Sequence, residues 1–126
     1  MNPTILVVED EHAMRILLRE FLEILGYNVI GAEQGKEAIE ISRSNPVDLA
    51  FLDMNLPDMN GLTLIQHLRG DPQTRPLRCI ALSADAMREQ IDAALAAGFD
   101  DYWTKPIDVR QVLHDLGRLL AEPAPG

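Results

Sequence analysis

The chain has 126 residues, a net charge of −9 and only 11 lysine and arginine residues, while 47% of its residues are hydrophobic. This length and composition fit one compact domain with a single core. The acidic balance, with no dense basic run, argues against nucleic acid or an anionic membrane surface as a direct partner.

Two further features indicate the cellular compartment. The first residues, MNPTILVVEDEH, contain too short an apolar run for a secretion signal or a membrane span. The single cysteine, Cys79, lies inside an apolar run, which is typical of a buried, unreactive thiol. We therefore expect a cytoplasmic protein.

Short β-rich runs alternate with helical patterns along the chain. Apolar residues at steps of three and four predict helices, and short apolar runs predict strands. Gly26 follows the first helix where a left-handed residue is needed, and Asn45–Pro46 ends the second helix. The predicted strands are 5–8, 27–32, 49–53, 78–83 and 101–105, and the predicted helices are 14–25, 36–44, 61–68, from Asp85 or Ala86 to 97, and 108–120.

Five strand–helix units in a row predict an α/β domain whose parallel sheet is covered by helices on both faces. We assign residues 1–121 to this domain. Residues 122–126, with two prolines and a glycine, have the composition of a flexible tail or linker. Parallel sheets of this kind bind ligands at the carboxyl ends of their strands.

Reactive side chains end four of the five predicted strands. Glu9 and Asp10 follow the first strand, Asp53 ends the third, Ser83 the fourth and Lys105 the fifth. These strand ends share one edge of a parallel sheet, so their side chains are expected to lie close together. Two carboxylates about 4 Å apart repel each other by about 4 kcal/mol at an effective dielectric of 20. The three carboxylates therefore favour a hard cation such as Mg²⁺, and Lys105 and Ser83 suit an anion. Each residue alone is typical of a turn or a solvated surface, but the combination predicts a phosphoryl-transfer site with Asp53 as the nucleophile.

Four motifs make the pattern recognisable: ILVVEDE, DLAFLDMNLPDMNG, IALSADA and DDYWTKP. With them, the chain resembles the receiver domain of two-component response regulators from about Thr4 to Leu120. The resemblance implies a flavodoxin-like fold with strand order 2-1-3-4-5. It also implies a phospho-accepting domain in a two-component or phosphorelay pathway.

The resemblance implies a metal site and a phosphorylation site. Asp53 is implied as the phospho-acceptor and as a ligand of Mg²⁺ or Mn²⁺. Asp10 is implied as the main acidic ligand, with Glu9 beside it and the backbone carbonyl of Asn55 as a further ligand. Glu9 stands where many relatives carry Asp, so its reach is one methylene longer and allows contact through water.

The same resemblance implies residues that contact the phosphate and a conformational switch. Ser83, which stands where Thr is common, and Lys105 are implied as the phosphate contacts, and the Lys105–Pro106 bond is expected to be cis. Tyr102 is implied as an aromatic that reorients together with Ser83. We expect this movement to change the surface built by the fourth helix, the fifth strand and the fifth helix.

The implied reaction needs a protein donor and ends in hydrolysis. The donor is expected to be a phosphohistidine on a histidine kinase or a histidine phosphotransfer protein, and the domain is expected to catalyse only the phosphorylation and dephosphorylation of its own aspartate. Asn55 and Asp85 each lie two residues after a site residue, where the family tunes loss of the phosphoryl group. Both are polar, so we expect a fairly short-lived phosphoprotein.

The remaining histidines and the tryptophan have structural interpretations. His67 and His114 are predicted on helix surfaces, and His12 lies near the predicted pocket, where a minor role in transition-metal binding is open. Trp103 alternates with Tyr102 along its strand, so it is predicted to face the core on the other side of the sheet.

Three other functions are weighed against this interpretation. A phosphatase with an aspartyl-phosphate needs a longer chain with a cap, and a flavin-binding module needs a neutral phosphate loop where this chain has Glu9-Asp10-Glu11. An interaction domain with an inert pocket does not need the complete set of acids, serine and lysine. The sequence leaves open whether the chain is a stand-alone regulator or a receiver from a hybrid kinase.

Overall fold

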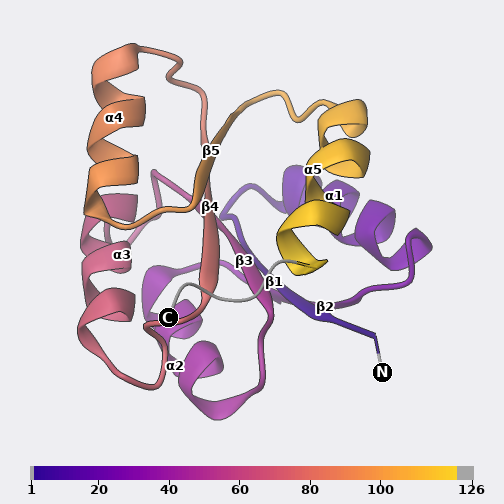
Figure 1. Ribbon diagram of the computed structural model, residues 1–126, viewed down its shortest axis with the longest axis horizontal. Coiled ribbons are helices and arrows are strands. Elements are labelled where there is room, and N and C mark those ends of the chain that lie inside the picture. The colour runs from indigo at the N-terminus through magenta and orange to yellow at the C-terminus, as the bar shows by residue number, and fades with distance from the viewer. Residues whose placement is uncertain (1, 122–126) are drawn as a thin grey trace.

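The structure is a computed structural model that describes residues 2–121 (Figure 1). Within this range, five strands alternate with five helices. The predicted tail, residues 122–126, lies outside the described residues. The elements are β1 (Thr4–Val8), α1 (His12–Ile24), β2 (Asn28–Ala32), α2 (Gly35–Ser44), β3 (Leu49–Asp53), α3 (Gly61–Gly70), β4 (Arg78–Ser83), α4 (Arg88–Ala97), β5 (Asp101–Thr104) and α5 (Val109–Ala121).

The strands form one parallel sheet in the order β2-β1-β3-β4-β5, which confirms the predicted topology. The pairing aligns the strand ends that carry polar residues. Asp53 pairs with Leu82, and the next residue, Ser83, pairs with Thr104. The third, fourth and fifth strands therefore end within one or two residues of each other at the same edge of the sheet.

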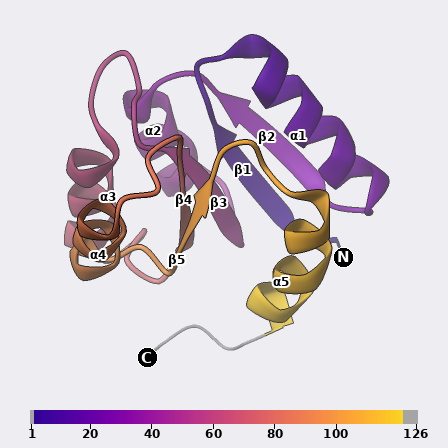
Figure 2. The same cartoon turned by 90° about the horizontal axis from the view of Figure 1, so that it is seen from above.

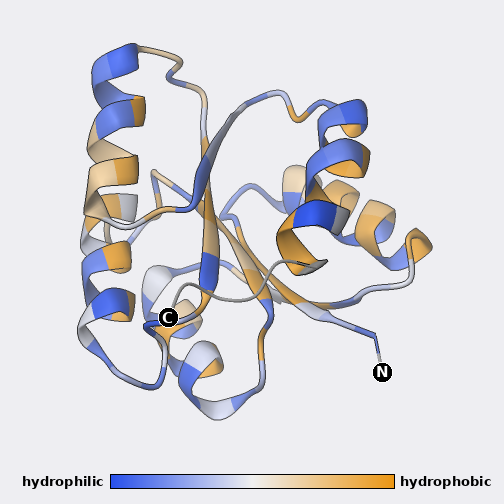
Figure 3. Cartoon of the chain, viewed as in Figure 1, coloured by the Kyte–Doolittle hydropathy of each residue, from blue (hydrophilic) through white to orange (hydrophobic). Residues whose placement is uncertain are grey.

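The helices cover both faces of the sheet, and each face has its own core. Helices α1 and α5 lie on one side, and α2, α3 and α4 lie on the other (Figure 2). The apolar colour in Figure 3 follows the strands and the helix sides that face them, while the outer side of α4 is hydrophilic in its first turns. All five residues of β3 are buried, because helices pack on both of its faces.

The predicted directions of the β5 side chains are confirmed. Trp103 is fully buried on the α1/α5 side, where its ring lies 5.2 Å from the ring of Phe51 at an angle of 52°. Tyr102 packs against the core on the opposite face. Cys79 is buried as expected, and burial raises the pKa of its thiol to about 12, which makes it unreactive.

The end of α1 shows the predicted glycine cap. Gly26 has a φ of 97°, its N–H donates to the carbonyl of Glu23, and the N–H of Tyr27 donates to the carbonyl of Leu22. This pair of hydrogen bonds is the Schellman arrangement, which needs a left-handed residue that glycine adopts without strain.

The predicted start of α4 is wrong by two or three residues. The helix begins at Arg88 and not at Asp85 or Ala86. The Asp85 side chain accepts a hydrogen bond from the N–H of Met87 at 2.9 Å, which holds this segment in an Asx turn. Aspartate competes for backbone donors in this way, so it delays the first helical turn.

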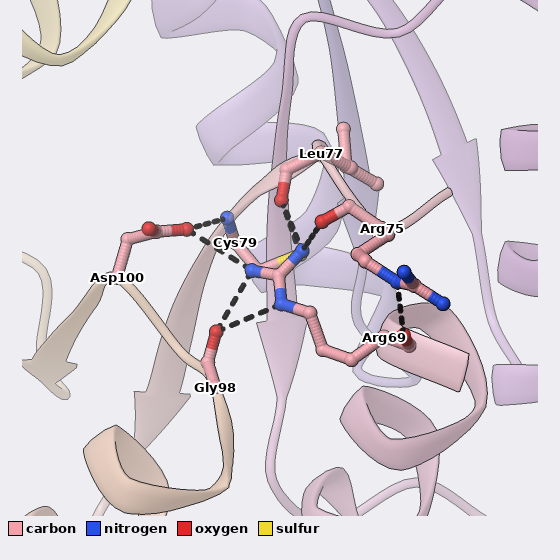
Figure 4. Close-up of polar contacts among 6 residues, drawn as sticks. All are labelled: Arg69, Arg75, Leu77, Cys79, Gly98 and Asp100. Atoms are coloured by element: carbon pink, nitrogen blue, oxygen red, sulfur yellow. Dashed lines mark hydrogen bonds and ion pairs between the residues drawn. The ribbon is translucent and has the colours of Figure 1, made fainter. Parts of the chain in front are cut away.

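Arg69 of α3 joins α3 to the segments around β4 and α4 (Figure 4). Its guanidinium donates to the carbonyls of Gly98, Leu77 and Arg75 at 2.6 to 3.0 Å, and to the Asp100 carboxylate at 3.2 Å. It thereby holds the carboxyl end of α4 in place. The described residues contain no helix that is both long and apolar enough to cross a membrane.

Candidate functional site

Three carboxylates meet at the carboxyl edge of the sheet. Glu9 and Asp10 come directly after β1, and Asp53 is the last residue of β3, which is paired with β1. One oxygen from each lies within 4.8 Å of the others. Glu9 is 0% exposed and Asp53 is 3% exposed, whereas Asp10 lies at the solvent surface. The predicted convergence of these side chains is confirmed.

Lys105 is the cation of this cluster. It follows β5, and its Nζ atom donates to Oε1 of Glu9 at 2.6 Å and to Oδ2 of Asp53 at 3.2 Å. The Lys105–Pro106 peptide bond that follows is cis, the isomer expected from the sequence. The lysine thus partly neutralises two buried carboxylates that would otherwise repel one another.

The proximity of these groups shifts their pKa values in different directions. Burial, together with a hydrogen bond to Asp53, raises the pKa of Glu9 to about 7, although Lys105 opposes this shift. Burial alone would raise the pKa of Asp53, but hydrogen bonds from Glu9 and from the Asn55 N–H, with the charge of Lys105, outweigh it and lower that pKa. Burial likewise works to lower the pKa of Lys105, and the two carboxylates raise it. Asp53 therefore carries the negative charge of the pair.

The loop after Asp53 is held by several hydrogen bonds. The N–H of Asn55 donates to Oδ1 of Asp53 at 3.0 Å, which leaves Oδ2 facing Lys105. Farther along the loop, the Asp58 carboxylate accepts the N–H groups of Gly35 and Lys36 at 2.9 Å each. Asp58 thereby caps the first turn of α2 and ties the loop after β3 to that helix.

Ser83, Asp85 and Tyr102 form a connected group beside the acidic cluster. The hydroxyl of Ser83, which is 3% exposed, accepts the N–H of Asp85 at 3.1 Å. The hydroxyl of Tyr102 donates to the carbonyl of Asp85 at 2.7 Å. The two residues predicted to move together are thus linked through the β4–α4 loop, a connection that spacing along the sequence does not reveal.

The donor set suits a small divalent cation. Glu9, Asp10 and Asp53 offer carboxylate oxygens, which are the ligands that Mg²⁺ and Mn²⁺ prefer over nitrogen or sulfur. The exposed position of Asp10 leaves this side of the cluster open to solvent. The residues present therefore fit the predicted metal.

The histidines lie where the sequence predicted. His67 is exposed on α3, and His114 is exposed on α5, with its Nδ1 atom 2.7 Å from the Asp115 carboxylate. His12 begins α1 and its Nδ1 contacts Arg15 at 2.8 Å. Among the described residues, the acidic group that could hold a metal does not include His12.

Two residues of the site region are not apparent from the sequence. Arg15 donates to the backbone carbonyl of Glu9 at 2.8 Å, and Asp58 caps a helix that begins 23 positions earlier in the chain. Both act through side-chain to backbone hydrogen bonds, Arg15 on the β1–α1 turn just before it and Asp58 on the start of α2. Hydrophobic periodicity and strand-end chemistry contain no signal for such contacts, so only the fold could identify them.

Comparison with known proteins gives consistent matches. The sequence model of the response regulator receiver domain matches residues 5–116. The chain is 35% identical over 113 residues to the sensor histidine kinase GacS of Pseudomonas protegens, covering 87% of this chain but only 12% of GacS. It is 30% identical over 122 residues to the polar-differentiation response regulator DivK of Brucella ovis, covering 97% of this chain and 99% of DivK.

A solved structure gives the same result for the fold. The receiver domain of the sensor histidine kinase PA1611 from Pseudomonas aeruginosa aligns with a TM-score of 0.88 at 27% identity, covering 97% of this chain and 100% of that domain. That crystal structure has a magnesium ion coordinated in its active site cleft.

Proposed function

The chain belongs to the response regulator receiver domain family of two-component and phosphorelay signalling, and from this premise we propose that Asp53 is the residue that accepts the phosphoryl group. One observation carries the proposal. The Asp53 carboxylate is buried, its pKa is lowered, and one of its oxygens faces the Lys105 ammonium at 3.2 Å in an otherwise acidic cluster.

The proposed reaction is in-line attack by a carboxylate oxygen of Asp53 on the phosphorus of a phosphohistidine. The new O–P bond forms as the P–N bond breaks, and the leaving nitrogen keeps the electron pair and takes up a proton. The Asn55 N–H orients the carboxylate through Oδ1, while Lys105 and the Ser83 hydroxyl are suited to hold phosphoryl oxygens. Preorganised groups of this kind lower the barrier through position and charge.

A divalent cation completes the proposed site. Glu9, Asp10, Asp53 and the backbone carbonyl of Asn55 would hold Mg²⁺ or Mn²⁺, which supplies positive charge to the transferring phosphoryl group. The acidic cluster of this chain supports that assignment, as does the magnesium ion in the receiver domain of PA1611. Lys105 contacts Glu9 and Asp53, so it would share these two carboxylates with the cation.

We propose that the Ser83–Asp85–Tyr102 group is the switch. When Ser83 turns toward the phosphoryl group, its hydrogen bond from the Asp85 N–H breaks. The hydrogen bond from the Tyr102 hydroxyl to the Asp85 carbonyl is then weakened as well. The movement is transmitted to the α4–β5–α5 surface, because Asp85 precedes α4 and Tyr102 lies in β5. We further propose that Asn55 and Asp85, both polar, orient the water that removes the phosphoryl group.

The proposed donors are a histidine kinase or a histidine phosphotransfer protein, and the proposed chemistry is limited to the chain's own aspartate. The chain matches DivK over 99% of its length and GacS over 12% of its length, so a stand-alone regulator and a receiver within a hybrid kinase both stay open. The cytoplasm is the proposed location, which suits the buried free thiol of Cys79.

Intact-mass spectrometry tests the proposal. The protein and its Asp53→Asn variant are incubated with a small acyl phosphate in the presence of Mg²⁺. We expect one added phosphoryl group on the wild type, and none on the variant or after EDTA. Equal addition to both proteins would contradict the assignment of Asp53, and no addition from either the acyl phosphate or a phosphohistidine protein would support an inert interaction domain.

A further inference from the structure

Arg15 lies in the first turns of α1 with its side chain only 11% exposed. Its Nη1 atom donates to the backbone carbonyl of Glu9 at 2.8 Å, and its Nη2 atom lies 3.0 Å from Oε1 of Glu33 and 2.8 Å from Nδ1 of His12. Its aliphatic stem covers Gly31, where an added Cβ would lie 3.5 Å from the arginine Cδ. One side chain therefore connects the β1–α1 turn, α1 and the residues after β2.

The Glu9 carbonyl belongs to the peptide group that joins Glu9 to Asp10. On its other side, the Glu9 N–H donates to the carbonyl of Ala32 at 3.0 Å. Both backbone polar groups of Glu9 are thus bound, and the plane of the Glu9–Asp10 peptide is held by Arg15. The Cα atoms of Glu9 and Asp10 lie at the two ends of this planar group, so its orientation affects the directions in which both acidic side chains leave the backbone.

We propose that Arg15 is a positioning residue of the metal site, because it fixes the peptide group between Glu9 and Asp10, the two acidic residues that follow β1. The proposal rests on the proposed function, in which these acids hold a divalent cation. The Arg15 guanidinium binds the backbone and not the carboxylates of the site, so it acts on the metal only through Glu9 and Asp10. Groups that orient metal ligands in this way typically change metal affinity by 10- to 100-fold when they are removed.

The direction in which Mg²⁺ affinity changes when Arg15 is replaced separates a positioning role from an effect of its charge. Arg15 is a cation close to a cation site, so its charge alone repels Mg²⁺ and its removal would strengthen binding. Loss of positioning has the opposite effect and weakens binding. Lysine keeps the charge but has no guanidinium fork, so Arg15→Lys isolates the contribution of the geometry.

The test uses isotope-labelled full-length protein titrated with MgCl₂ and followed by NMR amide shifts, which also report whether each variant is folded. We expect Arg15→Ala to weaken Mg²⁺ binding by about tenfold or more and Arg15→Lys to weaken it by a smaller factor. Arg19→Ala is the matched control, because Arg19 lies one turn later on α1 in an exposed pair with Glu23. We expect its Mg²⁺ affinity to equal that of the wild type.

Two results would overturn different claims. If the wild type binds Mg²⁺ and both Arg15 variants bind it equally well or more tightly, the positioning role is wrong and the metal site stands. If the wild type itself does not bind Mg²⁺, the proposed metal site is wrong, and the inference about Arg15 is overturned with it. Should Arg15→Ala fail to fold, Arg15→Lys alone decides the first question.

Discussion

The Nζ atom of Lys105 lies 2.6 Å from Oε1 of Glu9, a residue 96 positions away that is completely buried. The same nitrogen lies 3.2 Å from Oδ2 of Asp53. A single ammonium group therefore contacts the carboxylate that ends β3 and the one directly after its neighbour β1, so it affects both the charge of Asp53, the proposed nucleophile, and the affinity for a competing cation.

Replacing Lys105 separates these two effects. We expect Lys105→Met to slow phosphorylation of the protein by an acyl phosphate by about 100-fold, because a preorganised positive charge is lost. Mg²⁺ affinity should not fall, since the variant lacks a cation that competes for Glu9 and Asp53. Lys36→Met, which alters the only other lysine, is the control. A variant that loses Mg²⁺ binding together with phosphorylation would contradict this division of roles.

The stability of the metal-free protein should depend on the protonation of Glu9. Its pKa is raised from an ordinary value of 4.5 to about 7 in the folded protein. The folded state therefore binds this proton more tightly, and the resulting stabilisation is complete below about pH 4.5 and is lost as the pH rises through about 7.

Denaturant unfolding in EDTA between pH 5 and pH 8 measures this effect. Compared with Glu9→Gln, the free energy of unfolding of the wild type should decrease by about 1 to 3 kcal/mol over this range. The comparison with Glu9→Gln removes the contributions of other groups. Parallel pH profiles of the two proteins would show that Glu9 titrates normally.

The hydrogen bond from Tyr102 to Asp85 should restrain the loop before α4. We expect Tyr102→Phe to increase amide hydrogen exchange in residues 84–88 by about fivefold, which corresponds to a net loss of about 1 kcal/mol. Tyr27→Phe removes a tyrosine hydroxyl on the other side of the sheet and should leave this loop unchanged. Unaltered exchange in Tyr102→Phe would mean that the bond does not hold the loop.

Arg69 should contribute strongly to stability, because its removal takes away the guanidinium donors of the part-buried carbonyls of Gly98 and Leu77 and, among the described residues, leaves Leu77 with only the weak Cys79 Sγ donor at 3.5 Å (Figure 4). We expect Arg69→Ala to lower the free energy of unfolding by about 2 to 4 kcal/mol in denaturant unfolding. Arg110→Ala, at a side chain that is almost fully exposed, should change stability little. A similar small change for both variants would show that Arg69 is not an anchor.

The fold and the main site could be predicted because both depend on local patterns. The apolar run Leu49–Leu52 followed by Asp53 specifies a buried strand with a reactive end, and parallel pairing brings that end beside Glu9. The order of strands came from the resemblance to receiver domains. Apart from the strand order, these features need only periodicity, strand ends and the rule that parallel strands share an edge.

Other features depend on contacts that the sequence pattern does not contain. Asp85 was predicted to begin or precede α4 directly, yet its side chain binds the N–H of Met87 and moves the helix start to Arg88. The contact of Asp58 with α2 joins residues 23 positions apart, and the contact of Arg15 with the Glu9 carbonyl spans the β1–α1 turn. Such side-chain to backbone contacts are specific to the folded chain, so they appear only when the elements are in place.

Reduction of the phosphorylated protein with borohydride, followed by peptide mapping, is the most direct test of Asp53 as the phospho-acceptor. Borohydride converts an aspartyl phosphate to homoserine, which marks the modified position permanently. We predict homoserine at position 53 after treatment with a phosphohistidine donor and Mg²⁺, and unmodified aspartate at position 10. Homoserine at another position, with Asp53 intact, would contradict the proposed site.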